Sequence, residues 1–348
     1  MRILIIAPPW LPVPPPAYGG TEAVLDTLAR GLHHAGHHVV LYATGDSTCP
    51  VTTAWTYREA LGVGVGGAAP ELCHVVDAYD LMAEADIVHD HTLVGPVYAQ
   101  RFPALPVVTT NHGPFADELA TLYRAVAGRV PVIAISRHQA STAGPVPVAG
   151  VIHHGVDLGR FPFGDGNGGY ALFLGRMKPE KGVHRAVQVA RAAGVPLRIA
   201  AKMREPAEQA YFAERVEPLL GGEVEYLGEV GTDVKLELLA RASCLLNPIS
   251  WPEPFGMVMI EALACGTPVV VTPHGAAPEI VDPGVTGFIA ADSGGLAAAV
   301  SRVGGLDRHA CRRSVEERFS MARLAEDHLA LYQQVVGRSG RRSEATAA

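Results

Sequence analysis

The feature that most constrains the fold of this chain is an alternation of short apolar runs with longer segments of helical periodicity. Thr21–Ala35 is such a helical segment, and it stops before Gly36, a residue type that commonly ends helices. Strands that alternate with helices predict a parallel sheet covered by helices on both faces. The apolar runs predicted as strands in the first half are Ile3–Ala7, Val39–Ala43, Ile87–His89, Val107–Thr110, Val132–Ile135 and Val151–His153.

The alternation restarts after GDGNGG, residues 164–169, a glycine-rich stretch that we interpret as a domain boundary. Strands are predicted at Tyr170–Gly175, Leu197–Ala201, Val224–Leu227, Cys244–Leu246 and Val269–Val271. Helices are predicted at Gly182–Ala193, Pro206–Leu220, Asp233–Ala242 and Phe255–Cys265. The 348 residues suffice for two domains. We therefore expect an α/β protein of two doubly wound domains, 1–163 and 164–318, then a helix over 319–336 and a disordered tail over 337–348.

Charge and cysteine usage exclude several classes of protein. The net charge is −7, with 35 acidic and 28 basic residues, whereas nucleic-acid binding requires a basic face. The five cysteines form no CxxC pair, which argues against disulfides and against a zinc site. No run approaches the roughly 20 apolar residues of a membrane helix, and the apolar start of the chain is too short for a signal peptide. We expect a cytoplasmic protein with no nucleic-acid partner and at most peripheral membrane contact.

The segment YALFLGRMKPEKG, residues 170–182, places two cations where a predicted strand ends. Arg176 follows the strand directly, and Lys181 precedes a predicted helix that begins at Gly182. Cations beside a helix N-terminus are typical of an anion site. In open α/β sheets, ligands bind beyond the carboxyl ends of the strands. The alternative is a solvated loop whose charged side chains face water.

The segment WPEPFGMVMIEALACGTPVV, residues 251–270, contains a carboxylate in a helix that is otherwise apolar. Glu261 has only apolar neighbours one turn away, so a polar group must meet it. This group is either a structural partner, such as an arginine or a backbone amine, or a pair of ligand hydroxyls like those of ribose. Glu253 lies eight residues earlier, and Pro254 and Gly256 leave backbone amides available at the helix start.

These motifs together resemble the donor site of the retaining nucleotide-sugar glycosyltransferases of family four, group 1 type. Arg176 and Lys181 match its cations, and Glu253 and Glu261 match its E-x7-E motif. The resemblance extends to PPPAYGGTEAVLDTLARGLHHAGHHVVLYA (14–43), similar to the family's glycine loop and first helix, and to HHGVDLGRF (153–161). It implies the GT-B fold, in which two Rossmann-like domains face each other across a cleft. It also implies that the first domain binds the acceptor, the second binds the donor, and the C-terminal helix crosses back to the first.

The resemblance also implies a role for each matching residue. Arg176 and Lys181 would bind the donor diphosphate, and Glu261 would bind the ribose hydroxyls. Glu253 would contact the donor sugar and His112 would lie near it, so that the expected catalytic residues are His112, Arg176, Lys181 and Glu253. The remaining expected donor contacts are the glycine loop and the amides at the start of the later helix, namely Gly20, Phe255, Gly256 and Met257.

The chemistry implied is transfer of a sugar from a nucleoside diphosphate to an acceptor hydroxyl, with retention of configuration. Positive charge at the leaving phosphate would be the main catalytic device, with no metal and no cofactor. No Asp-x-Asp occurs in the chain, so the usual metal clamp of the other large glycosyltransferase fold is missing. UDP or GDP is the favoured donor nucleotide. The acceptor, whether saccharide, lipid or natural product, stays open.

The sequence departs from the family pattern at two places. His154 stands where the family usually has Asn before Gly-Val-Asp, and Ala276 and Ala277 replace its Gly-Gly. Roles for Lys202, His154 and Asp90 are undecided at this point. The alternatives are a nucleotide-sugar epimerase, a phosphorylase-like enzyme, a non-catalytic nucleotide-sugar binder and an NAD-dependent oxidoreductase. The last lacks a glycine fingerprint after the first strand.

Overall fold

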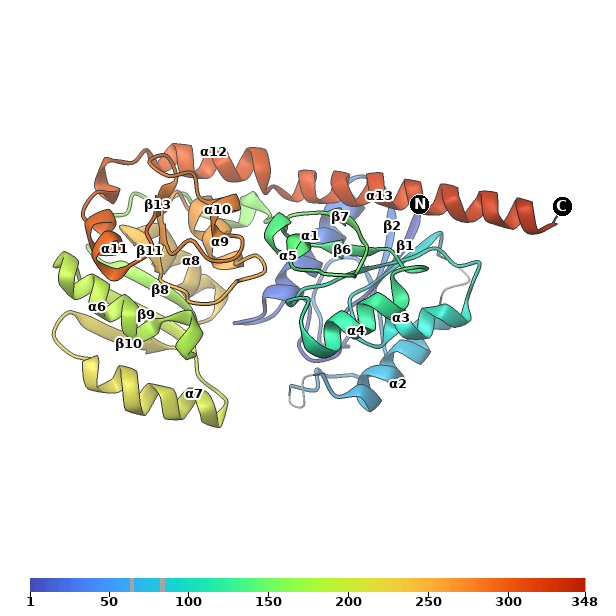
Figure 1. Cartoon of the computed structure of the whole chain (residues 1–348), viewed down its shortest axis with the longest axis horizontal. Coiled ribbons are helices and arrows are strands. Elements are labelled where there is room, and N and C mark those ends of the chain that lie inside the picture. The colour runs from blue at the N-terminus through green and yellow to red at the C-terminus, as the bar shows by residue number, and fades with distance from the viewer. Residues whose placement is uncertain (63–65, 82–84, 348) are drawn as a thin grey trace. The chain divides into compact units, whose positions relative to one another are not determined.

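The computed structural model describes residues 1–62, 66–81 and 85–347, and the chain divides into two compact units. The N-terminal unit contains residues 1–15, 19–155 and 321 onward. The C-terminal unit contains residues 16–18 and 156–320. Each unit holds one parallel sheet with helices packed on it, as the alternation of strands and helices predicts (Figure 1).

The N-terminal unit is built on a seven-stranded sheet of order β3-β2-β1-β4-β5-β6-β7, with every neighbouring pair parallel. The strands are β1 (Arg2–Ile6), β2 (His38–Ala43), β3 (Thr52–Trp55), β4 (Ile87–Asp90), β5 (Val107–Thr110), β6 (Val132–Ala134) and β7 (Val148–Val151). The helices are α1 (Gly20–His34), α2 (Ala68–Tyr79), α3 (Gly95–Tyr98), α4 (Asp117–Val126), α5 (Arg137–Ser141) and α13 (Met321–Ala347).

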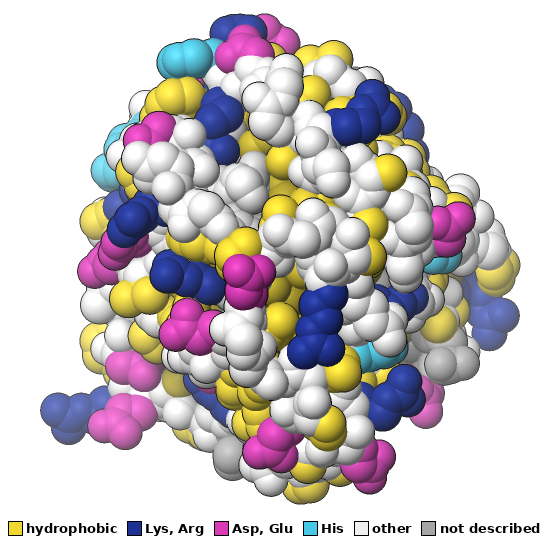
Figure 2. All heavy atoms as spheres, turned by 90° about the vertical axis from the view of Figure 1, so that its left-hand side faces the viewer, with side chains coloured by type: hydrophobic (Ala, Val, Ile, Leu, Met, Phe, Trp, Pro, Cys, Tyr) yellow, Lys and Arg dark blue, Asp and Glu magenta, His cyan; other side chains and the backbone are white. Residues whose placement is uncertain are grey.

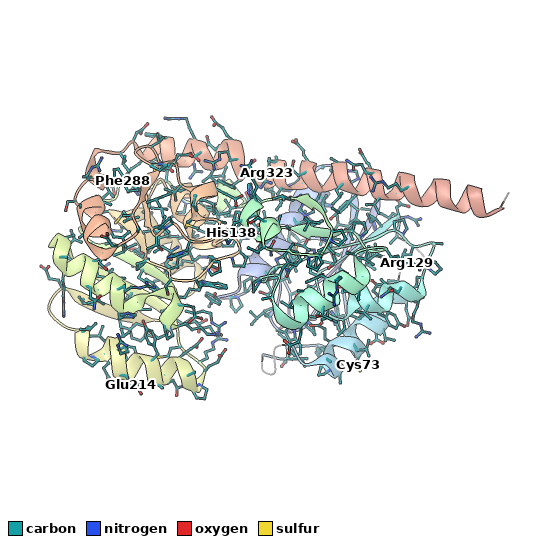
Figure 3. The ribbon with its side chains drawn as sticks, in the orientation of Figure 1. Cys73, Arg129, His138, Glu214, Phe288 and Arg323 are labelled. Carbon is teal, nitrogen blue, oxygen red and sulfur yellow. The ribbon has the colours of Figure 1, made fainter. Side chains whose placement is uncertain are left out.

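One prediction for this unit was wrong in detail, and several elements were not predicted. The strand predicted at 151–153 lies at Val148–Val151, and the elements not predicted are β3, α2, α3, α4 and α5. β3 is a half-exposed edge strand with the sequence TTAW, so it lacks the continuous apolar run that marked the buried strands. All five cysteines of the chain are free thiols, and Cys73 on α2 is the exposed one (Figure 3).

The C-terminal unit is built on a six-stranded parallel sheet of order β10-β9-β8-β11-β12-β13. The strands are β8 (Ala171–Arg176), β9 (Leu197–Lys202), β10 (Val224–Gly228), β11 (Cys244–Asn247), β12 (Val269–Val271) and β13 (Gly287–Ile289). The helices are α6 (Val183–Ala193), α7 (Pro206–Tyr211), α8 (Thr232–Arg241), α9 (Met257–Ala264), α10 (Ala277–Ile280), α11 (Ser293–Val300) and α12 (Arg308–Arg318). α6 packs with α11, and α9 packs with α8 and α12, forming two groups of helices (Figure 1).

The strand order of the C-terminal unit reverses at β8, whose neighbours are β9 and β11. Ligands of open α/β sheets bind beyond the carboxyl ends of the strands at such a point. The helix predicted over 206–220 is interrupted: α7 ends at Tyr211, and a π turn and a 3-10 turn follow it, with Pro218 in the latter. The face of this unit in Figure 2 carries acidic and basic side chains interspersed, without a patch of one sign.

The boundary between the units lies at Gly155–Val156, earlier than the glycine-rich stretch 164–169 that we interpreted as the boundary. That stretch is fixed to the C-terminal unit. The Arg308 guanidinium donates to the carbonyls of Gly164, Ala240 and Ala242, and the Gly164 amide donates to the Cys265 carbonyl. Glycine therefore marks a close approach of backbone segments here.

The last helix, α13, belongs to the N-terminal unit, where it packs against α1. Gly31 of α1 lies so close to α13 that a Cβ atom there would be 3.0 Å from the Met321 carbonyl and 3.1 Å from the Ala325 Cβ. α13 continues to Ala347, past residue 336, where the sequence predicted a helix end and a disordered tail. Within residues 1–62, 66–81 and 85–347, no helix combines the length and the apolar composition needed to span a bilayer.

Candidate donor-binding site

Arg176 is the last residue of β8, and its guanidinium is held by two carboxylates at the start of α7. Its Nε donates to Glu208 at 3.0 Å, and one terminal nitrogen contacts Glu205 at 2.6 Å and Glu208 at 2.8 Å. Burial lowers the pKa of Arg176, but Glu208, Tyr18 and Glu205 together raise it by more, so the net direction is upward. The side chain of Arg176 retains 24% exposure. The sequence did not predict these two carboxylate partners.

Lys181 lies in the turn between β8 and α6, and its ammonium group donates to Glu253. The ammonium also lies 5.0 Å from the ring centroid of Trp251, a cation–π contact. The turn is tied to the loop before α9, because the Ser250 amide donates to the Glu180 carbonyl at 2.9 Å. The structure thus brings together two of the predicted site residues, Lys181 and Glu253.

Glu253 is positioned by its own loop as well as by Lys181. The indole Nε1 of Trp251 donates to the same carboxylate oxygen at 2.9 Å, and the Ala276 amide donates to the Glu253 carbonyl at 3.0 Å. Gly275 allows this approach, since a Cβ there would lie 2.1 Å from the Glu253 carbonyl oxygen. Ala276 and Ala277, which depart from the family pattern, are fully buried.

Glu261 is buried within α9 and is met by a lysine. The Lys235 ammonium of α8 donates to its Oε1 at 2.7 Å, and Glu261 is 6% exposed. Among the described residues, no donor contacts the other oxygen, Oε2. A structural partner for Glu261 therefore exists, but it is the Lys235 ammonium and not the arginine or backbone amine named as examples. The carboxylate keeps one oxygen with accepting capacity.

The N-terminus of α9 lies between these two glutamates. Gly256 precedes the helix with φ of 95°, a left-handed conformation that favours glycine, and no side chain caps the first turn. The amides of Met257 and Val258 at the start of α9 have no intrahelical acceptor, whereas the Met259 amide donates to the Gly256 carbonyl at 3.0 Å. Phe255 is buried at 2% exposure and anchors the loop. The arrangement can accept the oxygens of an anion or a sugar.

His112 and Gly20, the other predicted site residues, belong to the N-terminal unit. Gly20 is the exposed first residue of α1, which also lacks a side-chain cap. His112 follows β5, and its Nε2 is 2.9 Å from the Nδ1 of His91. Burial is the main cause that lowers the pKa of His112 to about 4, and His328 adds repulsion.

His112 is one member of a row of five imidazoles, which we call the histidine row: His328, His89, His91, His112 and His154. Successive ring centroids are 5.3, 3.9, 5.1 and 5.3 Å apart. The pKa of every member is lowered, with burial as the largest cause. No group of three or more His, Cys, Asp or Glu side chains in the described part of the chain is arranged to hold a metal ion.

Side chains from β5 and from the last helix, α13, hold the histidine row in place. His89 contacts the hydroxyls of Tyr332 at 2.6 Å and Thr110 at 2.8 Å. Arg323, near the start of α13 (Figure 3), donates to the His154 carbonyl at 2.8 Å. Asp90, whose role the sequence left undecided, is fully buried and accepts from Tyr79 and Thr92. These contacts give Asp90 a structural role in shaping the loop after β4.

Sequence reasoning missed several residues of the candidate site. Trp251 stands within the quoted motif and could have been found from its position beside Glu253. The partners of Arg176 and Glu261 carried no such signal, because Glu205, Glu208 and Lys235 are separated from them by 26 to 32 residues. Lys202, weighed only as an extra donor contact, ends β9 in register with Arg176 at the end of β8.

Comparison with known protein families identifies the family of this chain. Residues 18–160 match the model described as glycosyltransferase family 4, and residues 162–304 match glycosyl transferases group 1. The chain belongs to the group 1 glycosyltransferases of family 4 type. The two matches together span most of both units, so the family assignment does not rest on the donor motifs alone. They do not favour the epimerase or the non-catalytic binder.

Curated relatives cover most of this glycosyltransferase. Glycogen synthase of Mycobacterium tuberculosis is 29% identical over 87% of the chain and 86% of its own length. The phosphatidyl-myo-inositol mannosyltransferase of Mycolicibacterium smegmatis is 26% identical over 86% of the chain and 84% of its own length. The sequence prediction of the family is thereby confirmed.

Solved structures confirm the GT-B fold of two Rossmann-like units. AviGT4, a glycosyltransferase involved in avilamycin A biosynthesis, is 26% identical, covers 97% of this chain and 98% of its own, and has a TM-score of 0.75. The Anabaena protein HepE, solved in complex with UDP and glucose, is 20% identical, covers 96% of this chain and 100% of its own, and has a TM-score of 0.74.

Proposed function

We propose that this glycosyltransferase moves a sugar from a nucleoside diphosphate to an acceptor hydroxyl, with retention of configuration and without a metal ion. The observation that carries the proposal is in the C-terminal unit. There Lys181 and Glu253 come together beside the N-terminus of α9, with Arg176 at the end of the central strand β8. The two cations Arg176 and Lys181, together with a helix N-terminus at the switch point of a parallel sheet, are suited to binding a nucleotide phosphate.

Arg176 and Lys181 would act on the leaving diphosphate. As the bond to the anomeric carbon breaks, negative charge grows on the phosphate and oxocarbenium character grows on the sugar. Cations already held in place stabilise that charge without reorganisation. Both side chains are held in place by carboxylates, which limits their motion before the donor arrives. Attack by the acceptor on the same face, assisted by the departing phosphate, would retain the configuration.

Glu253 and Glu261 would select and orient the donor. Glu261 would accept from the ribose hydroxyls through its Oε2, while Lys235 holds Oε1. Glu253 would accept from hydroxyls of the transferred sugar, and the amides of Phe255, Gly256 and Met257 would lie beside it. The N-terminal unit would supply Gly20 and His112. With a pKa of about 4, His112 is neutral at pH 7 and is suited to hydrogen bonding with sugar hydroxyls.

The relatives support a sugar nucleotide as donor and leave the acceptor class broad. HepE was solved with UDP and glucose, which supports UDP as the first nucleotide to try. The names of the curated relatives include a glycogen synthase and a phosphatidyl-myo-inositol mannosyltransferase. Both a saccharide and a lipid-linked acceptor are therefore worth testing, as is a natural product, given the avilamycin role of AviGT4.

The test is a transfer assay with purified protein, UDP-, GDP-, ADP- and dTDP-sugars and acceptors of these three classes. We expect release of one nucleoside diphosphate, unchanged by EDTA, and a product whose anomeric proton shows the donor's configuration by NMR. Arg176→Ala and Lys181→Ala should each lose about 2–4 kcal/mol of transition-state stabilisation. Inversion of configuration, strict dependence on a divalent metal, or unchanged turnover in both variants would contradict the proposal.

Glu261→Gln tests the nucleoside assignment separately. It keeps the shape of the side chain and should weaken nucleotide binding. Glu237→Gln is the matched control, because Glu237 is 68% exposed on α8 and pairs with Arg241 at 3.6 Å. Equal nucleotide affinity in both variants would make Glu261 a purely structural residue.

A further inference from the structure

Two cations lie side by side where β8 and β9 end. Arg176 and Lys202 are register partners on these parallel strands, and their side chains are 24% and 16% exposed. Partial burial lowers the pKa of Lys202, and the Arg176 charge lowers it further. Like charges held this close, and partly withdrawn from water, require an anion between them.

Two glutamates supply that negative charge, and they differ sharply in how they are held. Glu208 has a fully buried side chain that accepts from Arg176 and from the amides of Arg204 and Glu205. Burial raises the pKa of Glu208, but these hydrogen bonds outweigh it and lower the pKa overall. Glu208 is therefore a fixed structural anchor for Arg176.

Glu205 is a loosely held counter-ion in comparison. Its side chain is 52% exposed, and its Oε1 lies 2.6 Å from Arg176 and 3.9 Å from Lys202. The same carboxylate takes part in a capping box with Glu208 at the start of α7. Exposed ion pairs of this kind contribute little to stability. Leaving the two cations therefore costs Glu205 less than it would cost the buried Glu208, and an exposed side chain can turn away while the cap at Glu208 is kept or replaced by water.

We propose that Glu205 occupies part of the donor diphosphate position at Arg176 and Lys202, and that the diphosphate displaces it on binding. Lys202 then becomes a third donor-binding cation beside Arg176 and Lys181. This inference rests on the proposed function, in which Arg176 binds the diphosphate. No bond is made or broken: one carboxylate leaves two cations, and phosphate oxygens take its place.

The exchange has a direct consequence for affinity. A nucleotide must compete with Glu205 for Arg176, so the native carboxylate weakens binding. A diphosphate carries more negative charge than one carboxylate, so it gains from both cations while Glu208 keeps Arg176 aimed. Salt screens the exposed Glu205 contact more than the buried Glu208 contact, so raised salt reduces the advantage of removing Glu205.

The experiment measures the affinity of the whole protein for UDP, GDP, ADP and dTDP by calorimetry, at low and at raised salt. Glu205→Gln should tighten binding of the preferred nucleotide about three- to tenfold, and Lys202→Met should weaken it by a similar factor. Glu225→Gln is the matched control. Glu225 is 60% exposed on β10 and pairs with Arg198 at 3.5 Å, so its substitution removes the same charge from an exposed ion pair. Melting temperatures verify that each variant is folded.

The outcomes separate this inference from the proposed function. If a nucleotide binds and Arg176→Ala weakens it, but Glu205→Gln behaves like Glu225→Gln, the displacement is refuted and the function stands. If Lys202→Met binds as the wild type does, Lys202 is not a donor contact and the inference falls. If none of the four nucleotides binds the wild type, both proposals fail together. Tighter binding in Glu205→Gln but not in Glu225→Gln, together with weaker binding in Lys202→Met, supports the inference.

Discussion

Gly182 and Gly194 flank α6 and offer a matched test of how the Lys181 turn is built. Their backbone angles are nearly the same, with φ and ψ of 78° and 32° at Gly182 and of 67° and 35° at Gly194. A Cβ atom in this left-handed conformation costs about 1–2 kcal/mol, and the stiffer unfolded chain of an alanine variant returns about 0.4–1 kcal/mol. Backbone conformation alone therefore predicts similar small losses of stability for Gly182→Ala and Gly194→Ala.

Their surroundings differ, and this sets the expected difference. A Cβ at Gly194 meets no atom within 4 Å, whereas a Cβ at Gly182 would lie 2.2 Å from the Pro248 carbonyl oxygen. Relieving that overlap requires the backbone to shift, which adds about 1–3 kcal/mol as overpacking does. Because Gly182 follows Lys181 directly, the shift also moves the ammonium from Glu253. Gly182→Ala should therefore lose nucleotide affinity as well as stability.

The assay is urea unfolding followed by circular dichroism, together with nucleotide titration of each variant. The unfolding free energy should fall by about 1 kcal/mol or less in Gly194→Ala and by about 2–4 kcal/mol in Gly182→Ala. Only Gly182→Ala should bind nucleotide more weakly. Equal losses of stability, or wild-type affinity in Gly182→Ala, would refute the reasoning that this glycine serves the close approach to Pro248.

Three further predictions concern the donor site, the histidine row and the packing of the last helix. Trp251→Phe keeps an aromatic ring beside Lys181 but removes the hydrogen bond to Glu253, so KM for the donor should rise while the melting temperature stays near that of the wild type. An unchanged KM would remove Trp251 from the site. Burial lowers the pKa of His328 to about 4, so between pH 6.5 and 4 only the unfolded chain binds its proton, and stability falls as pH falls. Replacing His328 by Leu should therefore reduce the slope of unfolding free energy against pH in that window by up to about 1.4 kcal/mol per unit, and parallel curves would contradict it. Gly31→Val should push α13 from α1 and lower the melting temperature by several degrees, whereas Gly36→Val, which meets no atom, tests the backbone strain alone, and equal effects would refute the packing argument.

Much of the fold could be predicted from the sequence because parallel strands buried on both faces are continuous apolar runs. β8 and β11 begin as such runs, and each was predicted close to its observed bounds. β3 and β13 were not predicted, because both are edge strands with partly exposed side chains and neither is a continuous buried apolar run. We interpreted the glycine-rich stretch 164–169 as the boundary, but it packs within the C-terminal unit. Glycine occurs both in flexible linkers and where backbone segments pack closely, so the sequence does not distinguish the two.

The candidate site was predictable to the extent that its residues share a motif or a strand end. Lys181 and Glu253 were predicted from separate motifs and lie in contact. The carboxylates that hold Arg176 and the lysine that holds Glu261 arise from tertiary packing between helices and strand ends. No local pattern specifies such pairs, because the partners are 26 to 32 residues apart in the sequence.

The place of α13 has a consequence for the order in which the chain folds during synthesis. The N-terminal unit needs α13, which supplies Tyr332 to His89 and covers Gly31, yet α13 is made after all of residues 156–320. The C-terminal unit, apart from residues 16–18, can therefore be complete on the ribosome while the first 155 residues still lack a helix. Domains usually finish in the order of translation. Here the half that emerges first finishes last, and until then the apolar face of α1 is a surface for chaperones to protect.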